Sequence, residues 1–114
     1  MANLSNIKIK YLNKNITSII ISESKTYNAL SFKNLKDLIK AFKKLDNDKN
    51  VKVIIIEGSG KGFSAGHNLK EVRDLKIRIK YQKLFNLCSK LMLQIVEGKK
   101  PVIAKVHGAA FAAG

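Results

Sequence analysis

The residues with the clearest capacity for chemistry lie in a glycine-rich segment, GSGKGFSAGHNLKE, which spans residues 58–71. This segment follows an apolar run and opens a helical pattern, so its small residues hold several backbone N–H groups beside the start of a helix. Backbone N–H groups in such a place favour negative charge, either a phosphate or an oxyanion that develops on a carbonyl. The segment therefore predicts a site for an anion or an oxyanion.

A second segment of the same type, HGAAFAAG, covers residues 107–114 and follows the apolar run 102–106. If the two apolar runs are neighbouring parallel strands, the segments after them meet at the carboxyl edge of the sheet, where α/β folds bind ligands. Two convergent N–H groups are the minimum for an oxyanion hole. Small residues also permit close packing of a strand against a helix, so the pattern by itself favours neither interpretation.

Three nucleotide or nucleophile motifs fail on spacing or context. A Walker A loop needs Ser or Thr after Gly-Lys, where this chain has Gly, and the dinucleotide spacing G-x-G-x-x-G is absent. Residues 62–66, GFSAG, match the G-x-S-x-G elbow of serine hydrolases. That elbow joins strand and helix directly, whereas GSGKG intervenes here, and Asp74 lies too close to Ser64 for the usual triad with His107. We therefore do not expect Ser64 to be a nucleophile.

The first half of the chain shows the periodicities of two strands and a helix. Residues 7–12 and 16–22 are expected to form strands joined by a polar turn at 13–15. Residues 32–46 are expected to form an amphipathic helix with Ser31 as its N-cap. The apolar stripe of this helix is Leu35, Leu38, Ile39, Phe42 and Leu45, and its wet faces carry Lys33, Lys36, Lys40, Lys43 and Lys44.

The second half continues with strand, helix and strand. Residues 51–57 are almost all apolar, as is typical of a strand buried on both faces of a parallel sheet. A short helical turn is expected near Asn68, a longer helix over about 76–97, and another buried strand over 102–106. The longer helix has the apolar stripe Leu84, Leu87, Cys88, Leu91 and Ile95, so we interpret Cys88 as a core residue. The order β-β-α-β-α-β, with right-handed crossovers, predicts an α/β layered fold.

The length of 114 residues argues for one domain at most over residues 1–114. The hydrophobic fraction of 46% excludes a disordered tail, and no apolar run is long enough to span a bilayer, so we expect no membrane partner. Residues 1–22 lack the pattern of a secretory signal. Cys88 is the only cysteine, which excludes an internal disulfide and fits a reducing compartment, so we expect a cytoplasmic location.

The formal net charge is +14, and 20 of the 22 basic residues are lysines. Such a charge attracts polyanions of any kind. The lysines are spread over almost the whole chain, and ten asparagines and fourteen isoleucines accompany them, which indicates a compositional bias. Only two arginines could make bidentate base contacts, so we expect no specific nucleic-acid partner.

Three blocks of the sequence carry a resemblance to a known family. They are SKTYNALS (24–31), VKVIIIEGSGKGFSAGHNLKE (51–71) and KKPVIAKVHGAAFAAG (99–114). They resemble, in order, the N-A-L segment, the F-x-A-G-x-D-L-K-E loop and the K-P-V-I-A-x-V-N-G-x-A-x-G-G-G block of the crotonase (enoyl-CoA hydratase/isomerase) superfamily. FSAGHNLKE and GAAFAAG are most similar to the branch of enoyl-CoA hydratase domain-containing proteins. The resemblance implies the N-terminal part of a crotonase-like fold, a spiral of ββα repeats that is truncated here.

The resemblance also implies a site for acyl-coenzyme A, with the thioester as substrate and with no cofactor or metal. The backbone N–H groups of His67 and Ala113 would form the oxyanion hole. The substrate-binding residues carried over from the family pattern are Lys25, Thr26, Ala65, His67, Asn68, Leu69 and Lys70. We expect only the amide of His67 to act, and we expect His107, which stands where the family usually has Asn, to be a turn residue.

The sequence departs from the family pattern at several positions. Asn68 replaces the usual Asp, and Ala112 and Ala113 replace glycines, which narrows the expected oxyanion hole. The family's general acid/base carboxylates and its trimer-forming helices correspond to positions beyond Gly114. The glutamates of this chain match none of those carboxylates: Glu23, Glu57, Glu71 and Glu97.

Two functions therefore stay open. The first is an enoyl-CoA hydratase/isomerase-like protein whose complete form, as a homo-oligomer (trimer) or with a complementary C-terminal half, acts on acyl-CoA. The second is a non-enzymatic, truncated remnant that binds acyl-CoA weakly or acts as a basic module on polyanions. In either case we expect the isolated chain to lack hydratase activity, because general acid–base catalysis accelerates such reactions roughly 10²–10⁴-fold.

Overall fold

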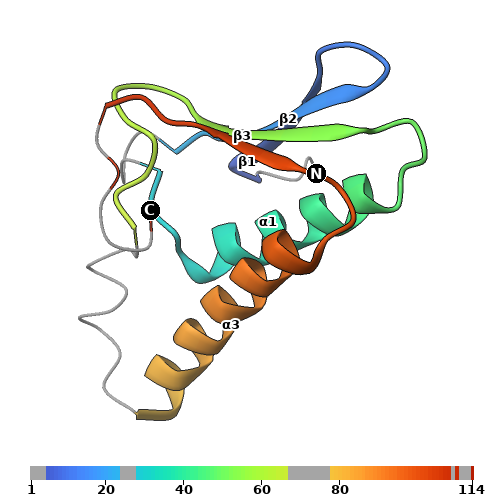
Figure 1. Cartoon of the computed structure of the whole chain (residues 1–114). Helices are drawn as coiled ribbons and strands as arrows, with labels where there is room; N and C mark the ends of the chain where they lie inside the picture. The colour runs from blue at the N-terminus through green and yellow to red at the C-terminus, as the bar shows by residue number, and fades with distance from the viewer. Residues whose placement is uncertain (1–4, 24–27, 67–77, 109, 111–113) are drawn as a thin grey trace.

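The computed structural model describes residues 5–23, 28–66, 78–108, 110 and 114. In these parts a four-stranded sheet is covered on one face by two helices (Figure 1). The elements in chain order are β1 (Ile7–Tyr11), β2 (Ile16–Ile21), α1 (Phe32–Asp46), β3 (Val53–Gly58), α3 (Arg78–Glu97) and β4 (Val102–Lys105). The predicted α/β layered architecture is confirmed.

The strands lie in the order β1-β2-β3-β4. β1 pairs with β2 in antiparallel fashion, whereas β2, β3 and β4 run parallel to one another. The turn between β1 and β2 is closed by the Asn13 side chain, whose Oδ1 accepts from the backbone N–H groups of Asn15 (2.8 Å) and Ile16 (2.9 Å). Because three neighbouring strands are parallel, the segments after β2, β3 and β4 all leave from the same edge of the sheet.

The core lies between the sheet and α1, as the apolar periodicity of residues 32–46 predicts. Ser31 caps α1 by accepting from the backbone N–H of Asn34 at 3.1 Å. Leu35, Phe42 and Leu45 are all at most 2% exposed. They pack with Ile19 and Ile54 from the middle of the sheet in one apolar cluster. Burial of this stripe is what holds α1 on the sheet, since a helix of this length is marginal alone.

The expectation that residues 51–57 are buried on both faces is wrong. β3 alternates instead between buried residues such as Ile54 and half-buried ones such as Ile55. In the described residues only one face of the sheet carries helices, so alternate side chains of β3 reach the uncovered face.

The prediction of a buried strand over 102–106 is also wrong in its burial and its end. β4 stops at Lys105 and is the edge strand of the four-stranded sheet. Ile103 is 55% exposed and Val106 is 54% exposed, because no neighbour covers the outer side of the strand among the described residues. The sequence of β4 is that of an interior strand, whereas its surroundings are those of an edge.

α3 partly matches its predicted stripe. Leu84 and Leu91 are buried, whereas Leu87, Cys88 and Ile95 are only partly buried against the same core cluster. The helix is described from Arg78, and the short helical turn expected near Asn68 lies outside the described residues. Neither described helix is long and apolar enough to cross a membrane.

Candidate functional site

The segments after β3 and β4 meet at the carboxyl edge of the sheet, as the sequence predicts. Ser64 and Ala110 form a parallel β-bridge between the two segments. The His107 ring nitrogen Nε2 lies 2.7 Å from the carbonyl oxygen of Gly60. His107 is therefore a residue that links two turns, in agreement with its predicted structural role.

Gly108 makes the close approach of the two segments possible, and Gly58 makes the tight turn within the first segment possible. A Cβ added to Gly108 would lie 2.1 Å from the Lys61 carbonyl oxygen, and Gly108 has φ +62°. A Cβ added to Gly58 would lie 2.3 Å from the Phe63 carbonyl oxygen. Close packing of backbone against backbone therefore accounts for these two small residues, and it brings the two segments together at the place expected for a ligand.

The Asn28 side chain contacts the backbone of the segment after β3 at several points. Its side chain is 1% exposed, and its Nδ2 group lies within hydrogen-bonding distance of the carbonyl oxygens of Ser59 (2.8 Å), Gly62 (3.1 Å) and Phe63 (3.2 Å). Its Oδ1 accepts from the backbone N–H of Glu23 at 2.8 Å. Asn28 also has φ +57°, a conformation that asparagine adopts more readily than most residues. One side chain thus joins the segments that follow β2 and β3.

Asn28 has no role of its own in the sequence-based site. The sequence feature that could have indicated its role is a polar residue inside SKTYNALS, a block that otherwise has the pattern of a segment leading into a helix. A buried amide needs partners for its donors and its acceptor, and the carbonyl groups near Nδ2 lie more than thirty residues along the chain. Sequence spacing does not reveal that pairing.

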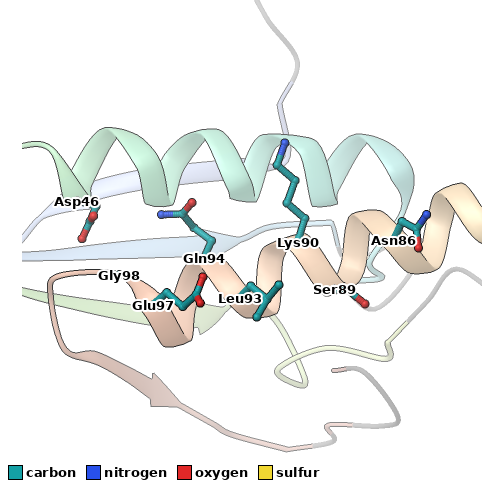
Figure 2. A pocket seen from close by; sticks show the side chains of 8 residues that line it. All are labelled: Asp46, Asn86, Ser89, Lys90, Leu93, Gln94, Glu97 and Gly98. Carbon is teal, nitrogen blue, oxygen red and sulfur yellow. The ribbon is translucent and has the colours of Figure 1, made fainter.

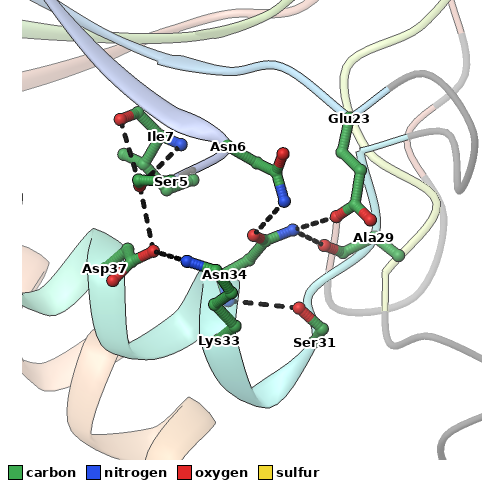
Figure 3. A network of polar contacts seen from close by, with 9 residues as sticks. All are labelled: Ser5, Asn6, Ile7, Glu23, Ala29, Ser31, Lys33, Asn34 and Asp37. Atoms are coloured by element: carbon green, nitrogen blue, oxygen red, sulfur yellow. Dashed lines mark hydrogen bonds and ion pairs between the residues drawn. The ribbon is translucent and has the colours of Figure 1, made fainter. Parts of the chain in front are cut away.

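A second polar network fixes the start of α1 beneath this loop (Figure 3). Asn34 is fully buried, and its Nδ2 donates to Glu23 Oε1 at 2.7 Å and to the Ala29 carbonyl oxygen at 2.8 Å. Asn6 Nδ2 donates in turn to Asn34 Oδ1 at 3.3 Å. The network ties residues 29–31 to α1 and to the residue before β1, so several hydrogen bonds fix the entry to the helix.

Ser64 and Gly66 show how the loop rests on residues 28–30. The Ser64 hydroxyl donates to the Asn28 carbonyl oxygen at 2.8 Å and accepts from the backbone N–H of Gly66 at 3.1 Å. The backbone N–H of Leu30 donates to the Gly66 carbonyl oxygen at 2.6 Å. Ser64 is only 2% exposed and serves as a structural link, so this geometry does not support a nucleophile.

Among the predicted site residues, only Ala65 lies within the described part of the chain, between Ser64 and Gly66. The other predicted site residues lie outside the described residues: Lys25, Thr26, His67, Asn68, Leu69, Lys70 and Ala113. Two of their covalent neighbours, Gly66 and Gly114, are described. The roles of these residues therefore stay predictions. The contacts of neighbouring residues in the segment after β3 are described above.

An apolar cavity of about 250 Å³ opens beside the junction of the two segments. Phe63 and Ser64 line it from the first segment, and Gly114 lines it from the second. The remaining wall is apolar and comes from the sheet and both helices: Ile21, Leu30, Leu38, Ile56, Leu91, Met92, Ile95, Val102 and Ala104. An alkyl or acyl group suits such a cavity, since the surroundings offer few polar partners.

A larger hollow of about 530 Å³ lies elsewhere, along α3 and the end of α1 (Figure 2). Its lining is mostly polar and includes Asp46, Lys90, Gln94 and Glu97. It contains no residue of the segments after β3 and β4. We therefore place the candidate site at the smaller cavity, where the loops and the apolar wall coincide.

Three glutamates lie within the described residues. Glu57 accepts from the Ser18 hydroxyl at 2.5 Å, and both residues alternate with core residues, so they lie on the sheet face that carries no helices. Glu23 accepts from Asn34, and Glu97 lines the polar hollow near the end of α3. The expectation that the glutamates of this chain match none of the family's proton-transfer groups stays a prediction, and Glu71 lies outside the described residues.

The part of the chain with described coordinates holds no group of three or more His, Cys, Asp or Glu residues that could bind a metal ion. Burial raises the pKa of the Cys88 thiol, which keeps it protonated and poorly nucleophilic. What the arrangement offers chemically is therefore a pair of backbone segments beside an apolar cavity.

Residues 12–114 match the sequence profile of the family described as enoyl-CoA hydratase/isomerase. The chain belongs to this family. It is 41% identical, over 99 residues, to the human mitochondrial protein named enoyl-CoA hydratase domain-containing protein 3. That alignment covers 87% of this chain and 33% of the human protein, so the chain spans about a third of the length of this relative. The resemblance of FSAGHNLKE and GAAFAAG to the enoyl-CoA hydratase domain-containing proteins is thus confirmed.

Solved structures of family members agree with the fold. An enoyl-CoA hydratase from Mycobacterium smegmatis superposes with a TM-score of 0.91 at 38% identity, covering 96% of this chain and 42% of that one. The human enoyl-CoA hydratase domain-containing protein 3 gives a TM-score of 0.88 at 37% identity, covering 95% of this chain and 42% of that one. The described architecture is therefore the crotonase fold over somewhat less than half of a complete family member.

Proposed function

We propose that the chain binds acyl-coenzyme A thioesters where the segments after β3 and β4 meet, with the thioester carbonyl oxygen held by two backbone N–H groups. The observation that carries the proposal is the apolar cavity, because residues of both segments line it. The family's name describes hydratases and isomerases of enoyl-CoA, which are acyl thioesters.

The two proposed donors are the backbone N–H groups of His67 and Ala113. His67 follows Gly66, whose carbonyl oxygen is bonded to Leu30, and Ala113 precedes Gly114, which lines the cavity. Neighbouring Cα atoms are about 3.8 Å apart, so both donors are tethered close to fixed points of the site. Lysines of the segments after β2 and β3, Lys25, Lys61 and Lys70, suit the phosphates of coenzyme A by charge.

Two fixed donors would stabilise the negative charge that develops on the thioester oxygen during enolate formation. Loss of one such donor typically costs about 10²–10³ in rate. Hydration also needs a group that transfers a proton to or from the substrate, and the glutamates of this chain match none of the family's proton-transfer carboxylates. We therefore expect the 114-residue chain to bind acyl-CoA without hydratase turnover.

The role of the His67 amide is tested by a pair of substitutions. His67→Pro removes the N–H, whereas His67→Ala keeps it and removes only the imidazole. We expect calorimetry with butyryl-CoA to show about tenfold weaker binding for His67→Pro and unchanged binding for His67→Ala, since one hydrogen bond contributes ~1–1.5 kcal/mol. Ala113→Pro and Ala113→Ser form a matched second pair.

Two results would contradict the proposal. Equal affinity of His67→Pro and the parent chain for butyryl-CoA would show that the His67 amide does not bind the ligand. Loss of the crotonyl-CoA absorbance with the purified parent chain would overturn the expectation that it lacks turnover. Far-UV circular dichroism of each proline variant controls for unfolding.

A second candidate function, sequence-independent binding of polyanions, is favoured by one observation. Every exposed position of α1 is a lysine: Lys33, Lys36, Lys40, Lys43 and Lys44. Lysine is a point charge that contacts phosphates without reading bases. Binding of this kind weakens steeply with salt, with a log–log slope close to the number of phosphates contacted. A salt titration with duplex DNA, repeated with Lys36→Glu/Lys40→Glu, tests it.

A further inference from the structure

Gly66 is held by hydrogen bonds on both of its peptide groups. Its backbone N–H donates to Ser64 Oγ at 3.1 Å, and its carbonyl oxygen accepts from the backbone N–H of Leu30 at 2.6 Å. Gly66 has φ +82°, a conformation that glycine adopts readily and that residues with a side chain rarely adopt. Because a glycine backbone has more freedom than any other, these two bonds decide which way its two peptide groups face.

The second of these peptide groups carries one of the proposed oxyanion donors. A peptide group is planar and almost always trans, so its N–H points away from its C=O. The carbonyl oxygen that Leu30 contacts belongs to Gly66, and the N–H of the same peptide group belongs to His67. A contact that fixes the Gly66 carbonyl oxygen therefore constrains the direction of that N–H.

The Ser64 hydroxyl holds the other peptide group and is itself held in place. It accepts from Gly66 and donates to the Asn28 carbonyl oxygen at 2.8 Å. Ser64 is 2% exposed and Asn28 is 1% exposed, so water does not compete for these bonds. A buried hydroxyl that donates and accepts at once is polarised by both partners, which strengthens the chain of bonds. Asn28 and Leu30 are two residues apart, so one short segment anchors Gly66 from both sides.

The position of Ser64 between the two glycine-rich segments indicates more than local packing. Ser64 forms the parallel β-bridge with Ala110 of the second segment, and it lines the apolar cavity. The second segment also carries Ala113, the other proposed donor. One residue thus contacts the anchor of the first donor, the segment of the second donor and the proposed place of the acyl group.

We propose that Ser64 is a positioning residue for the thioester oxyanion. Its hydroxyl, together with the Leu30 N–H, orients the peptide groups of Gly66 so that the His67 N–H is directed at the thioester oxygen before the ligand binds. The inference rests on the proposed function, because it takes the His67 N–H as one of the two donors. It also gives a role to the serine of the GFSAG motif, residues 62–66, other than that of a nucleophile.

A positioning role affects the polarisation of the thioester more than the affinity for the ligand. A hydrogen bond weakens steeply when its angle falls below about 120°, so a tilted N–H polarises the carbonyl group less. The contacts proposed for the acyl chain and for the phosphates of coenzyme A do not depend on this angle. We therefore expect Ser64→Ala to separate polarisation from binding.

Absorption spectroscopy with 2,4-hexadienoyl-CoA tests the proposal, because a dienoyl thioester absorbs at longer wavelength when its carbonyl oxygen accepts hydrogen bonds. At saturation the parent chain should produce such a red shift, and His67→Pro, which lacks the N–H, should lose most of it. Ser64→Ala should lose roughly half of the red shift or more, while its Kd for the probe rises less than about threefold. Ser64→Thr keeps the hydroxyl, and the adjoining cavity leaves room for its methyl group, so it should keep the red shift.

The matched control is Ser18→Ala, which also removes a buried serine hydroxyl. Ser18 is 0% exposed and donates to Glu57, but it lies on the sheet face that carries no helices. This variant should leave the red shift unchanged. Equal losses of the red shift in Ser18→Ala and Ser64→Ala would overturn the proposal. A loss in Ser64→Thr as large as that in Ser64→Ala would overturn it as well.

Hydrogen exchange of the parent chain decides the matter if Ser64→Ala does not fold. Because the proposed orientation precedes binding, the Gly66 amide should exchange about tenfold or more slower than in an unfolded chain, with no ligand present. Exchange at the rate of an unfolded chain would show that the Ser64 hydroxyl does not hold this amide, which would overturn the proposal.

Failure of the positioning role and failure of the proposed function give different results. A red shift that His67→Pro removes and Ser64→Ala leaves intact would contradict only the role of Ser64. A parent chain that does not bind the probe, or a red shift that persists in full in His67→Pro, would contradict the proposed function and this inference with it.

Discussion

α1 and α3 cover the same face of the sheet, but they meet the solvent in opposite ways (Figure 1). α1 buries its whole apolar stripe and exposes only lysines. α3 buries Leu84 and Leu91 and leaves Leu93 and Val96 largely exposed. α1 therefore presents only charged side chains at its exposed positions, whereas α3 also presents apolar ones. Apolar periodicity predicts both helices, but the difference between them is visible only in which side chains are exposed.

The largest effect that sharpens this comparison is expected from Phe42→Ala. Phe42 is 2% exposed on the covered side of α1, and removal of a buried Phe side chain costs about 3–5 kcal/mol. Val96→Ala on α3 should change the unfolding free energy by less than about 0.5 kcal/mol, since Val96 is 79% exposed. Urea unfolding followed by far-UV circular dichroism measures both. Similar losses for the two variants would show that Val96 is covered in the isolated chain.

The next largest effect is expected from Asn28, which anchors the loop on the covered side. Asn28→Ala removes the amide that bridges Ser59, Gly62 and Phe63 and leaves an alanine at φ +57°. We expect a loss of about 2–3 kcal/mol. Asn28→Gly loses the same hydrogen bonds without the backbone strain and should be less destabilised by about 1 kcal/mol. Two equal values would show that the backbone conformation contributes nothing.

Gly108 tests the corresponding contact on the β4 side. Gly108→Ala adds a Cβ 2.1 Å from the Lys61 carbonyl oxygen at a position with φ +62°. We expect a loss of about 2 kcal/mol, from the strained φ and from overpacking. Gly60→Ala is the matched control, because Gly60 has φ +82° and nothing within 4 Å of its added Cβ. The thermal unfolding midpoint of Gly60→Ala should lie between those of the parent chain and Gly108→Ala. The reverse order would exclude a contribution of the Cβ clash to the destabilisation of Gly108→Ala.

The sequence predicts most of the fold because each element has a local cause. The stripe of α1 and the Ser31 cap are set by spacing within one helix, and both are confirmed. The meeting of the two glycine-rich segments follows from parallel strands, and the bridge between Ser64 and Ala110 confirms it. These features need no knowledge of distant partners.

The missed features depend on partners that are remote in sequence or that the described residues do not include. Asn28 bonds to carbonyls more than thirty residues away, so no local pattern indicates its role. β4 has the composition of a buried strand, but such burial needs a neighbour on both sides, and among the described residues β4 pairs only with β3. The same reason explains Leu93 and Val96, which belong to no predicted stripe. Of the predicted site, only Ala65 can be placed, next to a serine that the loop uses as a link.

The smallest predicted effect compares the two sides of α3 through thiol reactivity. Burial raises the pKa of Cys88, so the thiolate fraction near pH 8 is lower in the folded chain than in urea. Because the folded pKa lies above the unfolded one, the stability linked to this group is present below the unfolded pKa and declines as pH rises through the folded pKa. Alkylation by iodoacetamide at pH 8, followed by mass spectrometry, should be several-fold slower in the folded chain than in urea.

An exposed thiol on the other side of the helix supplies the control. Leu93→Cys in a Cys88→Ala background places a thiol where the side chain is 55% exposed. That thiol should react in the folded chain about as fast as in urea, since little desolvation opposes its ionisation. Equal rates at the two positions in the isolated chain would mean that α3 has no covered and open side.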